Sequence, residues 1–182
     1  MLASLDRMKR VMQIPVEDTS MDETLLLLIV AATQAIEHHC KRTFRKQRYT
    51  ERISGHSSPY LNLRNYPIHQ VEEVRTDHLL GDYEEIGEGR LFRAKGWPVG
   101  EQNIFVSYVG GYVLPDEATG AEPRTLPESI ELACLLYVQM LGRNPGAKSE
   151  RVGDISVSYE EDTQSLPAPV AALLTPYVGR WV

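Results

Sequence analysis

The chain has few cysteines, no excess of basic residues and no long apolar run. Two cysteines in 182 residues, Cys40 and Cys134, do not make a secreted disulfide scaffold, and we expect both to be small buried side chains in a reducing compartment. With 25 acidic and 19 basic residues, the net charge of −6 argues against a general nucleic-acid binder. The longest apolar run, residues 25–32, is far below the ~20 residues of a membrane span, and no signal-peptide core precedes it. We therefore expect a protein made inside the cell, with no membrane partner.

Motifs for catalysis, metal binding or cofactor binding are also missing. The strongest candidate is Glu37-His38-His39-Cys40, within a predicted helix. Neighbouring helix residues point about 100° apart, so these side chains cannot converge on one ion, and no His pair has the i,i+4 spacing of a helical metal site. No nucleophile elbow, phosphate loop or dinucleotide fingerprint is present. We predict no catalytic, metal or cofactor residues.

The stretch from Ser20 to Arg42 predicts a long helix around which the chain is organised. Apolar residues recur on one helical face at Leu25, Leu28, Ile29, Ala32, Ile36 and Cys40. Further apolar residues, Leu26, Leu27 and Val30, lie on the other side. An ordinary surface helix has one apolar stripe, so this helix needs cover on two sides.

A second long helix is predicted from Thr125 to Gly142. Its main apolar face includes Ile130, Cys134 and Tyr137, which we expect to pack on Leu28, Ile29 and Ile36 of the first helix. Apolar residues again remain outside that face. The left-over residues of the two helices form the predicted subunit interface: Leu26, Leu27, Val30, Leu132, Leu135 and Leu136.

Between the helices, residues 45–113 change to strand-like alternation, with a hairpin signal across residues 49–63, and residues 114–124 form an acidic loop. After residue 142 come a strand or extended arm near residues 153–159 and a short helix after Pro167. We predict one domain, 1–182, of mainly helical α+β class. It is a small helical bundle (1–44 and 125–182) with an inserted antiparallel β region and an extended C-terminal segment.

Six segments, taken in order, resemble the head–tail connector (adaptor) family of long-tailed bacteriophages. They are L-D-R-M-K-R-V-M-Q-I at residues 5–14, D-E-T-L-L-L-L-I-V-A-A-T-Q-A-I-E at 22–37 and N-Y-P-I-H-Q-V-E-E-V at 65–74. Then follow V-S-Y-V-G-G-Y at 106–112, L-P-E-S-I-E-L-A at 126–133 and G-D-I-S-V-S-Y at 153–159. The resemblance lies in their order and spacing and covers nearly the whole chain.

The resemblance implies a structural, non-enzymatic protein of the virion neck, at the head–tail junction, assembled in the host cytoplasm. Such adaptors form a dodecameric ring under the portal protein. The ring extends a channel through which DNA passes without sequence-specific binding, and it provides the docking surface for the next neck or tail protein. The C-terminal segment in this family commonly reaches the portal, which makes Tyr177, Arg180, Trp181 and Val182 the predicted portal-binding residues.

Two other interpretations remain open on the sequence. The first is another neck protein, such as a head-closure or a tail-completion or terminator subunit. The second is a cytosolic enzyme with a site near His38, His39 and Cys40. A fixed small oligomer would favour the enzyme, whereas a monomer or a ring would favour the adaptor.

Overall fold

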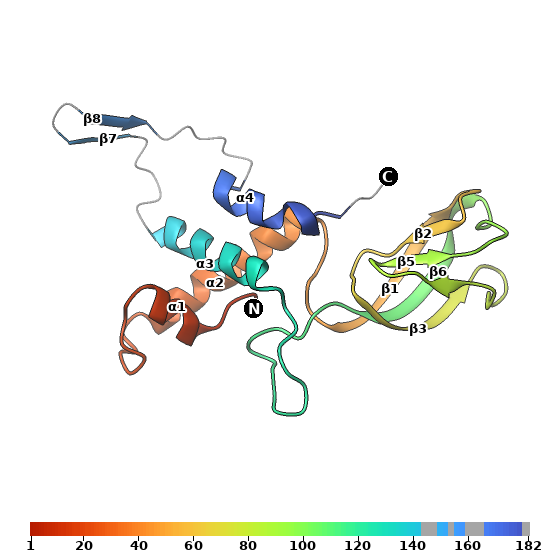
Figure 1. Ribbon diagram of the computed structural model, residues 1–182, viewed down its shortest axis with the longest axis horizontal. Coiled ribbons are helices and arrows are strands. Elements are labelled where there is room, and N and C mark those ends of the chain that lie inside the picture. Colours follow the sequence, from red (N-terminus) through yellow and green to blue (C-terminus); the bar gives the residue numbers. More distant parts are fainter. Residues whose placement is uncertain (143–148, 153–154, 159–165, 180–182) are drawn as a thin grey trace. The chain divides into compact units, whose positions relative to one another are not determined.

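The computed structural model describes residues 1–142, 149–152, 155–158 and 166–179 (Figure 1). The chain divides into two compact units. The helical unit comprises Met1–Cys40 and Pro127–Val178, and the sheet unit is built on Lys41–Leu126. The single domain predicted from the sequence stays a prediction.

The helical unit contains α1 (Leu5–Val11), α2 (Asp22–Cys40), α3 (Glu128–Gly142) and α4 (Ala168–Leu174), which runs into a 3-10 turn, η1 (Thr175–Tyr177). Ser4 caps α1, because its hydroxyl accepts the backbone N–H of Arg7 at 3.3 Å. The two long helices begin two to three residues later than predicted. Thr125, the predicted first residue of the second long helix, lies before α3, and its hydroxyl accepts the backbone N–H of Val113 at 2.9 Å. Within the described residues, no helix is long and apolar enough to cross a membrane.

The core of this unit lies where α2 packs on α3 and α3 packs on α4. The α2 residues predicted to face inward are at most 1% exposed, apart from the half-buried Leu28; they are Leu25, Ile29, Ala32, Ile36 and Cys40. On α3 the fully buried residues include Ile130, Cys134 and Val138. The predicted contact between the two long helices is confirmed.

The sheet unit contains two three-stranded antiparallel sheets. The first has the order β1 (Gln47–Gly55), β6 (Gly100–Gly110), β3 (Ile68–Arg75). The second has the order β2 (Tyr60–Asn62), β5 (Arg90–Phe92), β4 (Glu84–Glu85). One apolar cluster joins the strands and loops of this unit: Leu61, Leu63, Val74, Leu80, Leu91, Trp97, Ile104, Val106 and Tyr108.

The hairpin predicted across residues 49–63 is wrong. Strand β1 pairs with β6, with Ile53 opposite Ile104, and β2 pairs with β5, with Leu61 opposite Leu91. The loop after Gly55 therefore carries the chain from one sheet to the other instead of folding it back. Local alternation identifies a strand but does not choose its partner, which here lies about fifty residues further along the chain.

The mainly helical bundle predicted from the sequence is also wrong. Strands of 9, 8 and 11 residues form a sheet unit with its own hydrophobic core, beside four α-helices in the other unit. A further antiparallel hairpin, β7 (Ser149–Val152) and β8 (Ile155–Ser158), lies in the segment predicted to be extended. The fold is a balanced α+β structure rather than a helical bundle with a small insertion.

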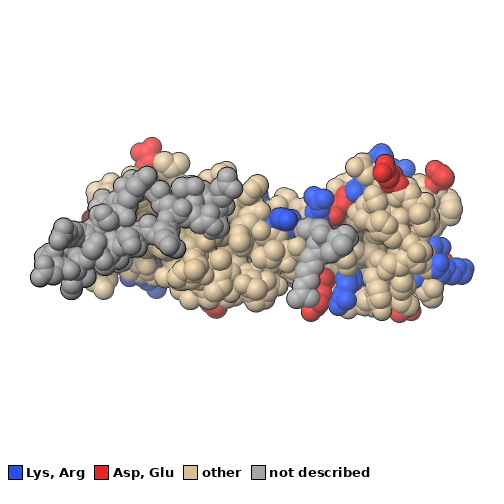
Figure 2. All heavy atoms as spheres, turned by 90° about the horizontal axis from the view of Figure 1, so that it is seen from above, with Lys and Arg blue, Asp and Glu red and all other residues tan. Residues whose placement is uncertain are grey.

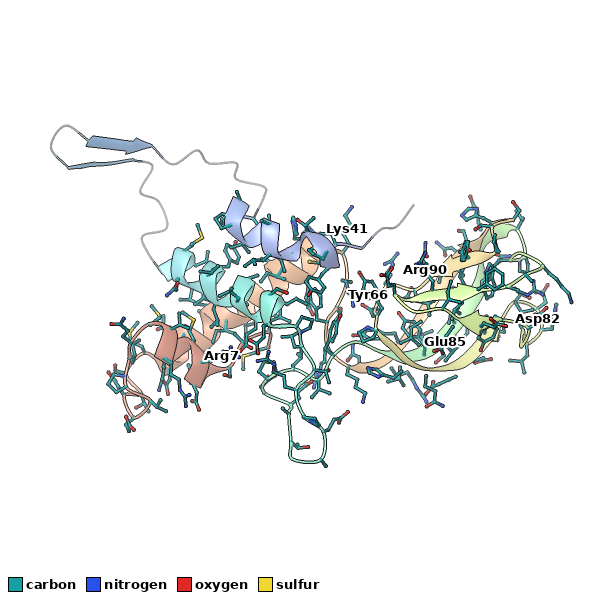
Figure 3. The ribbon with its side chains drawn as sticks, viewed as in Figure 1. Arg7, Lys41, Tyr66, Asp82, Glu85 and Arg90 are labelled. Carbon is teal, nitrogen blue, oxygen red and sulfur yellow. The ribbon has the colours of Figure 1, made fainter. Side chains whose placement is uncertain are left out.

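The residues just before β1 and just after β6 are hydrogen-bonded to each other. The backbone N–H of Tyr112 donates to the Phe44 carbonyl at 2.7 Å, and the N–H of Lys46 donates to the Tyr112 carbonyl at 2.7 Å. The guanidinium of Arg42 lies 3.5 Å from the centre of the Tyr66 ring, which gives a cation–π contact in a buried setting (Tyr66 is labelled in Figure 3). These contacts hold the entry and the exit of this unit together.

Candidate functional site

The helical unit exposes part of the predicted subunit interface. Leu27 is 69% exposed, Leu132 is 46% exposed and Val30 is 39% exposed. Leu26 and Leu136 are half-buried, and Leu135 is only 4% exposed. Leu135 therefore belongs to the core of its own subunit, while the other five residues have surface left for another chain.

Helix geometry explains why Leu27 is left outside. At 100° per residue, Leu27 points about 200° away from Leu25 and thus opposite the buried face of α2. A leucine costs roughly 1.5–3 kcal/mol to leave in water rather than bury. The exposed leucines of α2 and α3 lie on the sides of these helices that point away from the core, and they form a candidate contact surface.

The predicted portal-binding residues fall at the end of the described chain. Tyr177, in η1, is half-buried, and its hydroxyl lies 2.9 Å from the Ser129 hydroxyl of α3. This hydrogen bond fixes the last turn against α3 and leaves part of the ring exposed. Arg180, Trp181 and Val182 lie outside the described residues.

The candidate enzyme site is not assembled. His38 is exposed, His39 is half-buried and Cys40 is fully buried. No group of three or more His, Cys, Asp or Glu side chains in the described ranges could hold a metal ion. Burial raises the pKa of the other thiol, Cys134, to about 12, so it is a poor nucleophile at neutral pH.

Two buried ionic contacts in the helical unit were not predicted from the sequence. Lys9, 2% exposed, pairs with Asp22 at 2.5 Å and also donates to the Val16 carbonyl at 2.9 Å. Glu131, 1% exposed, accepts a hydrogen bond from Arg7 at 2.9 Å. Both contacts join α1 to other parts of the unit, so they serve packing rather than chemistry.

A polar cluster within the sheet unit was also missed. The hydroxyl of Tyr108 donates to the carboxylate of Glu51, and it accepts the backbone N–H of Asn65 at 3.0 Å. Burial raises the pKa of Glu51, although the hydrogen bonds from Tyr108 and from the Arg64 backbone oppose the shift. The signal was present, because Glu51 alternates in register with Tyr49 and Ile53 and so shares their inward face.

The outer face of the first sheet carries paired charges. Arg48 and Glu72 form an ion pair at 2.7 Å, and the Ser107 hydroxyl on the strand between them donates to Glu72 at 2.9 Å. The Arg48 hydrogen bond is the main reason that the pKa of Glu72 is lowered. Arg75 lies over the Phe105 ring at 4.4 Å. The charge of Arg48 on this face is thus paired with Glu72, whereas a nucleic-acid platform would leave its basic residues free for phosphates.

A family model described as head completion protein matches residues 1–178. The chain belongs to the head completion protein family. This membership confirms the resemblance to head–tail connectors and the structural virion role predicted with it. No curated protein matches the chain.

Solved structures of phage-like particles share the fold of this head completion protein. A chain in "Neck of empty GTA particle computed with C6 symmetry" is 12% identical with a TM-score of 0.62, over 100% of this chain and 91% of that chain. A chain in "Virion of native gene transfer agent (GTA) particle" is 14% identical with a TM-score of 0.63, with the same two coverages. A third, in "Neck of native GTA particle computed with C12 symmetry", is 14% identical with a TM-score of 0.55, over 89% and 85%.

Proposed function

We propose that this protein is the subunit of a dodecameric ring in the neck of a phage-like particle. The ring lies under the portal at the head–tail junction, extends the DNA channel and provides the docking surface for the next neck or tail protein. The observation that carries the proposal is the match of the head completion family to residues 1–178, over a fold similar throughout to a chain of a particle neck.

Exposed apolar residues of the helical unit support self-association. A closed ring uses heterologous interfaces, so each subunit needs two different patches, one for each neighbour. Leu27 and Val30 on α2 supply one candidate patch, and Leu132 on α3 supplies another. Leu26 and Leu136 add half-buried surface beside them.

The charge distribution suits a channel through which DNA slides. The sheet unit, 41–126, has equal numbers of acidic and basic residues, so the net charge of −6 comes from the rest of the chain. Figure 2 shows both kinds of charge interspersed over the sheet unit, with no extended basic surface on the face that is visible. Few attractive phosphate contacts mean little resistance to passage.

Portal binding is assigned to the C-terminal end. Tyr177, Arg180, Trp181 and Val182 combine aromatic, cationic and apolar groups, which are the types that most often anchor interfaces. The hydrogen bond between the hydroxyls of Tyr177 and Ser129 fixes the point from which this end leaves the helical unit.

The ring is tested by comparing Leu27→Glu with Leu79→Glu. Both leucines are strongly exposed, 69% and 72%, and both variants gain the same charge, but Leu79 lies in the sheet unit. We expect both proteins to melt like the wild type, and only Leu27→Glu to fail to form rings on portal-bearing capsids, as seen by electron microscopy. Normal rings of Leu27→Glu would contradict the assigned interface, and the absence of rings in the wild type would contradict the function.

A further inference from the structure

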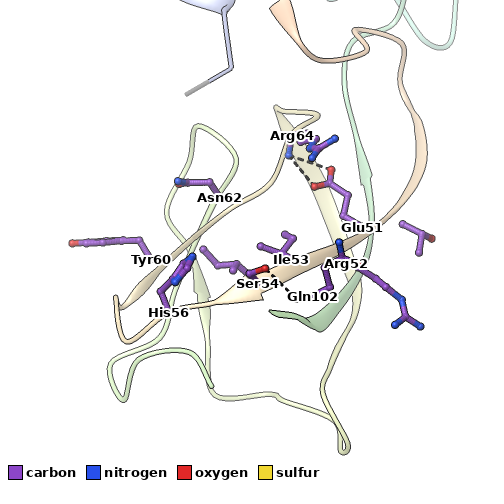
Figure 4. Close-up of a pocket in the computed structure, with 11 residues that line it drawn as sticks. Glu51, Arg52, Ile53, Ser54, His56, Tyr60, Asn62, Arg64 and Gln102 are labelled. Atoms are coloured by element: carbon purple, nitrogen blue, oxygen red, sulfur yellow. Dashed lines mark hydrogen bonds between the residues drawn. The ribbon is translucent and has the colours of Figure 1, made fainter. Parts of the chain in front are cut away.

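The two sheets leave a groove between their free edges. Strand β1 is the outer strand of the first sheet and β2 is the outer strand of the second. A cavity of about 550 Å³ lies between them, lined by the consecutive residues 50–54 and 60–62, with His56, Arg64 and Gln102 at its margins (Figure 4).

The lining pattern identifies the walls of this groove as strand edges. Successive side chains of a strand point to opposite faces of its sheet, so a cavity above one face is lined by every second residue. Here five residues in a row, from Thr50 to Ser54, border the cavity. The edge of β1, with its backbone groups, therefore forms one wall, and three consecutive residues of β2 form the other.

In the described part of the chain no strand fills this groove. Strand β1 is paired with β6 alone, and β2 is paired with β5 alone. Two side chains of β1 make hydrogen bonds here: the Glu51 carboxylate accepts the Arg64 backbone N–H at 3.2 Å, and the Ser54 hydroxyl accepts that of Gln102, on the paired strand β6, at 3.0 Å (Figure 4). Open strand edges of this kind bind added strands through main-chain hydrogen bonds.

The β7–β8 hairpin is a two-stranded sheet that could pair with a further strand. Of the described elements, only β8 makes extensive contact with β7, and the reverse is also true. A lone two-stranded hairpin is marginally stable in water and gains stability when a third strand joins it. Each of its strands has four residues, or about 13 Å, against about 16 Å for the five residues of β1 that border the groove.

Charge favours the same pairing. Arg52 and Arg64 lie exposed at the groove; Arg52 has no ion-pair partner among the residues that the structure describes, whereas the charge of Arg64 also acts on the Glu51 carboxylate. The sequence directly after β8 continues Tyr159-Glu160-Glu161-Asp162. A strand that carries this acidic segment beside Arg52 gains an opposite-charge pair at the rim.

We propose that the β7–β8 hairpin of one copy of this chain adds to the groove between β1 and β2 of another copy. The pairing joins the two three-stranded sheets of the receiving subunit through the hairpin of its neighbour. It rests on the proposed ring for its geometry, since each subunit gives one hairpin and receives one, as a heterologous interface requires.

The test uses full-length single-cysteine additions and a short bismaleimide cross-linker. One protein carries Thr50→Cys, in the groove, and a second, of different size through an added tag, carries Ser156→Cys in β8. The matched control replaces the first by Gln70→Cys, which is equally classed as exposed but lies on β3, the opposite edge of the same sheet. The native Cys40 and Cys134 are both fully buried and contribute little background.

We expect the Thr50→Cys and Ser156→Cys mixture to give roughly tenfold or more covalent heterodimer than the control mixture, because docking holds the two thiols at high effective concentration. Equal yields from the two mixtures would overturn the proposal. A cross-linked monomer, without dimer, from the double variant would assign the hairpin to its own chain and would also overturn it. Rings without the heterodimer would contradict docking of the hairpin in the groove but not the proposed neck function. The heterodimer without rings would contradict the proposed neck function but not the docking of the hairpin.

Discussion

The guanidinium of Arg7, on α1, lies 2.9 Å from the Glu131 carboxylate, which α3 carries into the core with 1% exposure. Arg7 also reaches Glu128 at 2.8 Å on the next turn of the same helix. A buried carboxylate without its cation costs several kcal/mol, but Arg7 is itself 44% exposed and its contribution is screened by water. The ion pair therefore ties a short helix to a long one at a modest net gain.

Arg7→Ala should accordingly lower the free energy of unfolding by about 1–3 kcal/mol, because Glu131 keeps its burial and loses its counter-charge. The measurement is urea denaturation followed by circular dichroism. Arg10→Ala is the control, since it removes the same charge from the exposed end of the same helix. Equal effects of the two substitutions would mean that the contact with Glu131 does not stabilise the fold.

Leu25→Ala should cost about 2–5 kcal/mol, as expected for a leucine that is 1% exposed. Leu27→Ala, two residues away on the same helix, should change stability by no more than about 0.5 kcal/mol, because its side chain already lies in water. Thermal and urea unfolding of the isolated protein provide both numbers. Similar losses for the two variants would show that the faces of α2 are assigned wrongly.

Glu51→Gln should change the pH dependence of stability. Burial raises the pKa of Glu51, so the folded protein binds this proton more tightly than the unfolded chain does. Stability from this group is therefore fully present below the ordinary carboxyl pKa and is lost as the pH rises through the raised value. Glutamine keeps an oxygen that can accept from Tyr108 and Arg64 but has no proton to lose.

The check is the free energy of unfolding of both proteins between about pH 4 and pH 7, a range that starts near the ordinary carboxyl pKa. The wild type should lose stability relative to Glu51→Gln as the pH rises. The comparison is needed because other carboxyls, such as Glu72 and Asp82, have lowered pKa values and act in the opposite direction. A difference that is constant across this range would contradict the raised pKa.

Deletion of residues 179–182 should leave the melting temperature nearly unchanged, because it spares α4 and the hydrogen bond between Tyr177 and Ser129. The shortened protein should no longer attach to portal-bearing capsids, as measured by co-sedimentation. Trp181→Phe keeps an aromatic side chain and should retain most of the attachment, whereas Trp181→Ala should lose it. Attachment of the deletion variant at wild-type strength would remove these residues from the portal contact.

The helices could be predicted from the sequence because their evidence is local. Leu25, Ile29 and Ile36 recur within one helix at its own period, and the same spacing places Leu27 outside. The burial of the charged groups of Lys9 and Glu131 could not be predicted in this way, because each group has an ion-pair partner on another element.

The extent of the sheets was underestimated because their pairing depends on residues that are far apart in the sequence. Strand β6 contains Gly100, Gln102 and Asn103, which read as a loop, and its pairing with β1 joins residues about fifty positions apart. Register shifts in β3, between Ile68 and Gln70 and again between Val71 and Glu73, break the alternation that would mark a strand. The groove between β1 and β2 depends on both pairings, so no local pattern could indicate it.

The hydrogen bonds between Phe44, Lys46 and Tyr112 make the sheet unit a loop that is closed at its own base. A segment whose first and last residues are neighbours needs only one point of attachment in the chain that carries it. Such a segment can be gained, lost or exchanged between related genes as a cassette. The residues between Phe44 and Tyr112 thus form a self-contained insertion in the chain that carries the helices.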